Sequence, residues 1–193
     1  MRSPAVLGAI TGLLAVGFAQ GAFALGCRED GGWLAHKCAR IAEALHEGQH
    51  DLYLPLHARH GRHTYSAQRV SEFNEDSLGI GFGRSVIDQH NHWLGDWHGI
   101  YLMGFRDSHY KLQTMLGYGY QSYLGGGKLK LGLGYTAFLT SRQDIAGGFP
   151  IPAVLPMASI NYGGASLMGA YIPRLSSKEG NGDVLFLFGH FSY

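Results

Sequence analysis

The sequence predicts an all-β fold, an eight-stranded antiparallel transmembrane β-barrel with an N-terminal amphipathic helix. Its 193 residues include 30 glycines and 11 tyrosines, and only 15% are charged; this composition suits closely approaching strands and aromatic girdles. After residue 51 the chain breaks into short segments of β character, and it ends in an aromatic residue, Tyr193, as outer-membrane strands commonly do. Beyond the N-terminus no apolar run is long enough for a spanning helix, so strands that enter lipid must close into a barrel.

Residues 1–24 have the features of a secretory signal peptide. Arg2 precedes an apolar run that leads to an A-x-A cleavage pattern ending at Ala24, so we expect the mature chain to begin at Leu25. A membrane-anchoring helix is one alternative, although the run is shorter than the ~20 apolar residues that a spanning helix needs. A lipoprotein acylated on Cys27 is another, although the residues before Cys27 match a lipobox poorly.

Residues 25–50 are expected to form a periplasmic segment with an amphipathic helix. From Gly32 to Glu47 the apolar residues recur at helical spacing, and Gly48 is a suitable stop. A helix placed before a barrel would lie at the membrane interface, and packing on a soluble core explains the pattern equally well. Cys27 and Cys38 could pair in an oxidising compartment, where a bridge would staple this segment and do no chemistry.

Residues 51–193 are expected to form the barrel itself. The predicted strands lie near 52–65, 78–88, 96–106, 113–123, 128–139, 154–163, 165–173 and 183–192. Their connections alternate between short and long, which fits short periplasmic turns, long outer loops and both termini on the periplasmic side. A soluble lipocalin-like barrel is the competing interpretation.

The predicted interior of the barrel is apolar and rich in glycine. If the terminal aromatic residue faces lipid, the strand alternation turns Phe186 and Phe188 inward, and the fourth strand turns Met115, Gly117 and Gly119 inward. An eight-stranded barrel normally fills its bore with side chains. Inward glycines with apolar neighbours instead predict a narrow slot for a straight hydrocarbon chain; a tightly packed core in which the glycines relieve crowding is the alternative.

Neither a metal nor a nucleic acid is expected as a partner. Among 11 histidines, His57, His60 and His63 recur at every third position. On a strand His60 would face away from the other two, so the spacing does not suit a metal site. A net charge of +1 and the lack of a basic run argue against a phosphate backbone as ligand. We expect no cofactor.

Three polar residues could perform acyl transfer at one rim of the barrel. His60 lies near the outer end of the first strand, and Asp107 and Ser108 lie together in the second outer loop. Acyl transfer needs a group that generates or positions a hydroxyl nucleophile, together with donors for the developing oxyanion. An alternative role for Asp107 is to cap its own turn.

At the level of motifs the sequence resembles the lipid A palmitoyltransferase (PagP) family. The resemblance covers nearly the whole mature chain in order, and its most specific block is WHGIYLMGFRDS at 97–108. The other matching motifs are DLYLP at 51–55, HGRHTY at 60–65, FNE at 73–75, GIGFG at 79–83, GYGY at 117–120, LGLGYTA at 131–137, LPMAS at 155–159 and AYIP at 170–173.

This resemblance implies an outer-membrane acyltransferase that moves a palmitoyl chain from the sn-1 position of a glycerophospholipid to a hydroxyl of lipid A. The family's surface His, Asp and Ser fall on His60, Asp107 and Ser108. His60 would then be the general base or would orient the acceptor hydroxyl, and Asp107 would orient His60. Ser108 would aid positioning, with a role as covalent nucleophile as the alternative that the sequence leaves open. The phospholipid donor, the lipid A acceptor and the outer membrane are the implied partners, and the chain is expected to act as a monomer or dimer.

Further residues are carried over for the binding of the lipids. The glycine that sets the floor of the family's acyl pocket falls on Gly119, with Gly117 beside it, and an arginine of the third outer loop falls on Arg142. The prolines that open lateral lipid entrances fall on Pro55, Pro156 and Pro173, which suits a residue without a backbone donor for the ladder.

The sequence also departs from the family pattern. A fourth gate proline is replaced by Ser77 or its neighbour, a tyrosine expected in the last outer loop is missing, and two cysteines precede the barrel. Two other functions are compatible with the strands, namely a non-catalytic adhesin or structural barrel and a lipid A deacylase. The lipid A position that would be acylated stays open.

Overall fold

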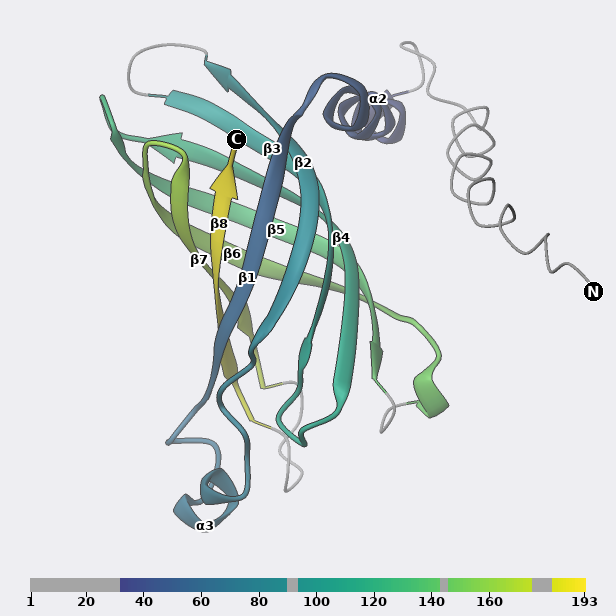
Figure 1. Cartoon of the computed structure of the whole chain (residues 1–193), viewed down its shortest axis with the longest axis vertical. Coiled ribbons are helices and arrows are strands. Elements are labelled where there is room, and N and C mark those ends of the chain that lie inside the picture. The colour runs from purple at the N-terminus through teal and green to yellow at the C-terminus, as the bar shows by residue number, and fades with distance from the viewer. Residues whose placement is uncertain (1–31, 90–93, 143–145, 175–181) are drawn as a thin grey trace, which may run out of the picture. The chain divides into compact units, whose positions relative to one another are not determined.

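The computed structural model describes residues 32–89, 94–142, 146–174 and 182–193 (Figure 1). By its internal contacts the chain divides into two units, Met1–Ala42 and Glu43–Tyr193. Helix α2 (Gly32–Glu47) has the predicted bounds. It contains Cys38, which is disulfide-bonded, whereas the predicted signal peptide and Cys27 lie outside the described residues. In the described ranges no helix is both long and apolar enough to cross a membrane.

Eight antiparallel strands close into a barrel in the order of the sequence, with β1 paired to β8 (Figure 1). This confirms the predicted fold class. The strands are β1 (Gln49–His60), β2 (Gly79–Gln89), β3 (Leu94–Arg106), β4 (Leu112–Leu124), β5 (Leu129–Arg142), β6 (Ile151–Tyr162), β7 (Ala165–Ile172) and β8 (Val184–Ser192). We call the end with the β1–β2, β3–β4, β5–β6 and β7–β8 connections the loop end, and the end with the C-terminus the terminal end.

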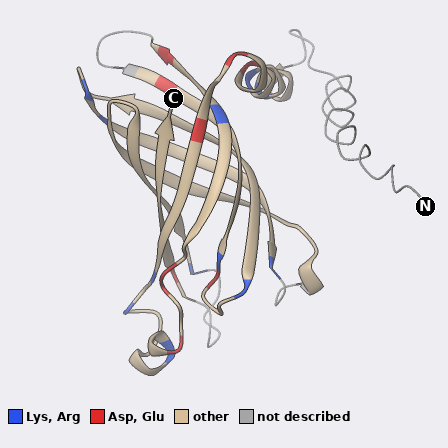
Figure 2. Ribbon diagram, viewed as in Figure 1, with Lys and Arg blue, Asp and Glu red and all other residues tan. Residues whose placement is uncertain are grey.

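Side chains alternate between the bore and the outer surface. On β4, Met115 and Tyr123 are buried in the bore, whereas Leu116 and Leu124 are exposed outside. Large exposed apolar residues recur in the same way on the other strands, and Figure 2 shows the charged residues mainly toward the two ends of the strands. An apolar outer band is what membrane barrels present to lipid.

The first connection is more structured than the sequence predicts. Strand β1 ends at His60, because Thr64 and Tyr65 donate to the carbonyl of Gly61 and form a turn there. A short helix, α3 (Ala67–Ser71), follows the turn and is capped by the Ser66 hydroxyl. The β5–β6 connection holds the short 3₁₀ helix η1 (Ala146–Gly148).

A β-bulge in β1 decides which side chains of its loop-end half face the bore. Tyr53 and Pro55 are buried, and the register with β8 then shifts between Pro55 and His57. After the shift it is Ala58 and His60 that are buried. Without the extra residue, the period of two would turn His60 to the outer surface.

The terminal end of the bore is filled by side chains. Gln121, Ser159 and Asn161 form a chain of bonds, with Ser159 donating to Gln121 over 2.7 Å and Asn161 donating to Ser159 over 2.9 Å. Nearer the end, Nε2 of His190 lies 3.1 Å from a carboxylate oxygen of Asp51, and both residues are buried. The open slot expected along the barrel is therefore confined to its loop-end half.

Arg84 of β2 binds the end of α2. Its guanidinium donates to the carbonyl of Leu45 over 2.5 Å and to that of Gly48 over 3.0 and 2.6 Å. The last carbonyls of a helix lack partners within the helix, and a cation there also complements the helix dipole. A Cβ at Gly48 would lie 2.3 Å from the carbonyl oxygen of Ala44, so this tight exit requires glycine.

We expect Arg84→Met to lower the free energy of unfolding by about 1.5–3 kcal/mol, the range for hydrogen bonds to charged groups. Denaturant unfolding of the folded barrel in detergent micelles measures this change. Arg106→Met is the matched control, since Arg106 is exposed at the loop end of β3. An equal loss of stability in both variants would contradict a specific role for Arg84.

Candidate active site

An internal cavity of about 690 Å³ occupies the loop-end half of the bore. Its size lies within the usual range for small-ligand sites. Aromatic and methionine side chains of the strands make up most of the wall, namely Met103, Phe105, Met115, Phe138, Phe186 and Phe188. Polar side chains stand at the mouth, among them His60, Ser108 and Arg142.

Aromatic rings close the deep end of the cavity. Tyr101 and Thr136 line it there, and their side-chain oxygens lie 2.5 Å apart. A Cβ at Gly119 would lie 2.7 Å from the Trp97 ring, and one at Gly117 would lie 2.5 Å from the Tyr101 ring. The two glycines thus face the bore, but they make room for the rings that form the floor and do not line the open space themselves.

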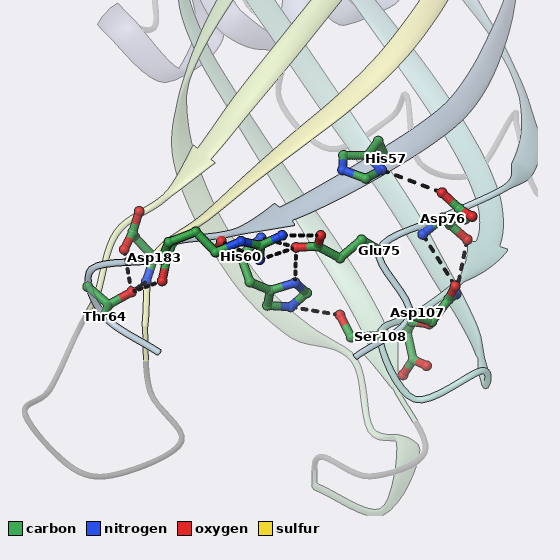
Figure 3. A network of polar contacts seen from close by, with 11 residues as sticks. His57, His60, Thr64, Glu75, Asp76, Asp107, Ser108 and Asp183 are labelled. Carbon is green, nitrogen blue, oxygen red and sulfur yellow. Dashed lines mark hydrogen bonds and ion pairs between the residues drawn. The ribbon is translucent and has the colours of Figure 1, made fainter. Parts of the chain in front are cut away.

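His60 and Ser108 meet at the mouth of this cavity. His60 is the last residue of β1 and Ser108 belongs to the β3–β4 connection, and Oγ of Ser108 lies 3.0 Å from Nε2 of His60 (Figure 3). The ring of His60 stacks on Phe73 with centroids 4.3 Å apart and meets Tyr65 edge-on at 5.5 Å. These aromatic contacts hold the imidazole in one orientation beside the serine.

The carboxylate that contacts His60 belongs to Glu75. Its Oε1 lies 3.3 Å from Nδ1 of His60 and accepts the backbone N–H of His60 over 2.8 Å (Figure 3). Arg62 donates to both oxygens of Glu75, over 2.9 and 2.7 Å. This ion pair lowers the pKa of Glu75 to about 2 and raises the pKa of Arg62.

The contacts assign a role to each nitrogen of the His60 ring. An ionised carboxylate can only accept, so Nδ1 carries the proton and donates toward Glu75. Nε2 of the neutral ring is then an acceptor that faces the hydroxyl of Ser108. A histidine held in this way can take a proton from a hydroxyl group.

Asp107 makes different contacts from those that the sequence analysis predicted. One carboxylate oxygen accepts the backbone N–H groups of His109 and Lys111, each over 2.8 Å, and the other lies 3.5 Å from the Arg142 guanidinium. The same turn holds Tyr110 at a φ of 63°, a left-handed conformation that is uncommon outside glycine. Asp107 thus holds its turn, and Glu75 occupies the place that Asp107 was expected to take beside His60.

Arg142, the last residue of β5, completes the polar mouth. Its guanidinium also lies 3.4 Å from the His109 ring. The structure therefore brings His60, Asp107, Ser108 and Arg142 to one rim from three different segments. As for metals, no group of three or more His, Cys, Asp or Glu side chains within the described ranges could hold an ion.

Two strand pairs of the barrel separate toward the loop end. The β6–β7 ladder runs from Tyr162 to Met157 and stops before Pro156, and Ile172 and Pro173 line the cavity at this gap. The β1–β2 ladder stops at Tyr53, two residues before Pro55. The three prolines singled out in the sequence thus lie close to the ends of interrupted ladders, where a residue without an N–H is tolerated.

Sequence reasoning missed Glu75, the two rings around His60 and the Tyr101 ring at the deep end of the cavity. Glu75 is separated from His60 by 15 positions, and nothing in a linear pattern distinguishes it from the neighbouring Glu72 and Asp76. The FNE motif at 73–75 was a signal that this segment is more than a surface loop.

The depressed pKa of Glu75 predicts a specific pH dependence of stability. Its ordinary value is 4.5 and its folded value about 2, so its contribution is complete above about pH 4.5 and is lost as the pH falls toward 2. We expect the difference in unfolding free energy between the wild type and Glu75→Gln to be constant down to about pH 5 and then to shrink.

Unfolding in detergent across this pH range measures the difference. Glu72→Gln is the control, since it removes only an exposed ion pair with Arg69 and should change little. A Glu75 contribution that persists unchanged near pH 2 would contradict this account.

Comparison with known proteins gives a family. Residues 40–190 match the family model described as "Antimicrobial peptide resistance and lipid A acylation protein PagP". A protein of Methylobacillus flagellatus named "Lipid A acyltransferase PagP" is 44% identical over 168 residues, covering 86% of this chain and 88% of the relative. Relatives of the same name in Bordetella parapertussis and Legionella pneumophila are 41% and 40% identical, covering 89% and 80% of this chain and 91% and 80% of their own lengths. The chain therefore belongs to the PagP family.

Proposed function

We propose that this chain is an outer-membrane lipid A acyltransferase that moves a palmitoyl chain from the sn-1 position of a glycerophospholipid to a hydroxyl of lipid A. The relatives' name, "Lipid A acyltransferase PagP", supports the reaction class. The observation that carries the proposal is the joint position of two features. An apolar cavity with a closed deep end opens where the hydroxyl of Ser108 meets Nε2 of His60.

The cavity favours an acyl chain of limited length. Each methylene group that enters the apolar bore contributes about 0.8 kcal/mol, so binding rewards a chain that fills the space. A longer chain would meet the Tyr101 ring, and its ester would then stand away from His60. Selection of one chain length follows from the distance between the aromatic floor and the polar mouth.

His60 acts as the general base in the proposed reaction. The acceptor hydroxyl of lipid A approaches Nε2 of His60, which takes its proton as the oxygen attacks the ester carbonyl of the donor. The C–O bond of the ester then breaks, and the proton passes from His60 to the departing lysophospholipid oxygen. Ser108 positions the hydroxyl, Asp107 holds the turn that carries Ser108, and Arg142 stands where anionic headgroups would lie.

The donor enters from the side of the barrel in this proposal. The end of the β6–β7 ladder, with Pro156 and Pro173 beside it, is the proposed entrance, and Pro55 lies near the end of the β1–β2 ladder. A lipid can then slide in from the bilayer without leaving it. Gly119 and Gly117 act on the acyl chain through the rings that they admit.

The proposed location places the loop end outside the cell. Residues 1–24 would be removed as a signal peptide, residues 25–50 would form a periplasmic segment with the amphipathic helix, and residues 51–193 would span the outer membrane. Exposed Trp33 and Leu34, at 74% and 71%, support contact of the helix with the membrane interface.

A lipid A deacylase is the second candidate. Ser108 contacts His60, and His60 contacts Glu75. This series of contacts resembles that of a hydroxyl nucleophile, its general base and a carboxylate that orients the base. The two enzymes change the mass of lipid A in opposite directions.

We expect expression of the wild type to add a palmitoyl increment to lipid A, measured by mass spectrometry, and His60→Ala to reduce the modified fraction strongly. A general base contributes about 10²–10⁴-fold to the rate. His63→Ala is the control, because His63 is exposed in the adjacent turn. A mass decrease, no increment with wild type, or an undiminished increment with His60→Ala would overturn the proposal.

Gly119→Met should shorten the acyl chain that the enzyme prefers, because the new side chain must displace Trp97 and Met157 toward the cavity. Competition among synthetic phospholipids of different chain length measures the preference. Gly104→Met is the control, since a Cβ there has its nearest neighbour at 3.8 Å. An unchanged preference in Gly119→Met would show that this position does not set the length.

A further inference from the structure

We infer that Asn74 and Glu75 are the positioning residues of this active site: Asn74 fixes the Ser108 backbone and Glu75 fixes the His60 ring. Two adjacent residues of the β1–β2 connection would thereby set the contact between the serine and the histidine. This inference rests on the proposed function, since it assigns roles within the same site.

Glu75 holds the end of β1 where β2 no longer pairs with it. The carbonyl of Glu75 accepts the N–H of Ala58 over 2.8 Å, and its carboxylate accepts the N–H of His60 over 2.8 Å. These are the bonds that a neighbouring strand would otherwise provide. Because the same carboxylate oxygen also contacts Nδ1 of His60, one group fixes both the main chain and the ring.

Asn74 holds the opposite side of the site. Its backbone N–H donates to the carbonyl of Ser108 over 2.9 Å, and its side-chain amide donates to the carbonyl of Asp107 over 3.2 Å. A second bond of the amide, to the carbonyl of Asp76, keeps the side chain in place. Asn74 is buried, so these bonds are protected from exchange with water.

The two sets of contacts are linked by a single peptide unit. The serine comes from the β3–β4 connection and the histidine from β1, and residues 74 and 75 touch both. This link is shorter than the route through the strands. A shift of about 1 Å in the position of a catalytic group can lower the rate about 100-fold. Loss of this link could therefore lower the rate strongly.

Arg62 holds the Glu75 carboxylate in its orientation. The guanidinium binds both oxygens of Glu75 and donates to the carbonyl of His60 over 3.1 Å. A bidentate pair of this kind is geometrically specific. Glu75 therefore acts mainly by orienting the His60 ring, since its charge is already balanced by Arg62.

The first test is a split between kcat and KM in detergent, with a synthetic sn-1 palmitoyl phospholipid as donor and purified lipid A as acceptor. We expect Glu75→Ala to lower kcat by about 100-fold. Asn74→Ala loses the amide bond to the Asp107 carbonyl but keeps the N–H bond to Ser108, and should lower kcat less. Both should leave KM for the donor nearly unchanged. Glu75→Gln should recover part of the loss, because its amide oxygen can still accept from His60. Glu72→Ala, in the same connection, should match the wild type.

The second test follows the His60 ring directly and does not need turnover. Nitrogen-15 NMR of the barrel in micelles, with His60→Gln used to assign the signal, reports the tautomer of the ring. We expect the Nδ1–H tautomer in the wild type and a mixture in Glu75→Ala, because that tautomer loses its acceptor. Glu75→Leu, which is similar in size and has no acceptor, replaces Glu75→Ala in both tests if Glu75→Ala does not fold, with folding judged by heat-dependent gel mobility.

The two tests separate the failure of this inference from the failure of the proposed function. Wild-type kcat in folded Glu75→Ala, or an unchanged His60 tautomer in that variant, overturns the positioning role of Glu75, and wild-type kcat in folded Asn74→Ala overturns that of the Asn74 side chain; acyl transfer stands in either case. A wild type without acyl transfer overturns the proposed function, and the tautomer measurement then still decides whether Glu75 directs the ring.

Discussion

The closure of the backbone ladder is the constraint on which the rest of this structure depends. A strand in lipid must find partners for its N–H and C=O groups on both sides, and a ring of eight antiparallel strands provides them. Once the ring is closed, the period of two assigns each side chain either to lipid or to the bore. The site can then exist only where this rule is relaxed, at the loop end, where the β1–β2 and β6–β7 ladders stop short.

The bulge between Pro55 and His57 connects this constraint to the chemistry. It changes the parity of β1 within the strand, so that His60 turns to the mouth of the cavity and Arg59 to the outer surface. The interrupted pairing leaves backbone donors at Ala58 and His60 that Glu75 accepts. The interruption of the ladder thus provides the backbone groups that hold Glu75 beside His60.

The sequence was sufficient for the fold class and the bounds of α2, because alternation and helical spacing are properties of neighbouring residues. Loop order placed His60 and Ser108 at one rim, but the bulge that turns His60 toward Ser108 was not predicted. The sequence did not predict the contact between Glu75 and His60. A turn and a short helix separate the two residues, and no strand or helix periodicity relates them. The sequence also predicted a floor of glycine, whereas rings occupy the space that Gly117 and Gly119 leave. Asp107 and Glu75 are both acidic and near the site, and only the three-dimensional path of the chain separates their contacts.

The filled terminal half of the bore has a consequence for the envelope of the cell. Rings of Trp97 and Tyr101, the bonded Gln121, Ser159 and Asn161, and the Asp51–His190 pair stand in series between the cavity and the terminal end. Hydrated ions need a continuous column of water, and packed rings with internally bonded polar groups interrupt it. In an outer membrane, a barrel built in this way would leave the permeability barrier intact, so its mouth can stay open without making the protein a pore.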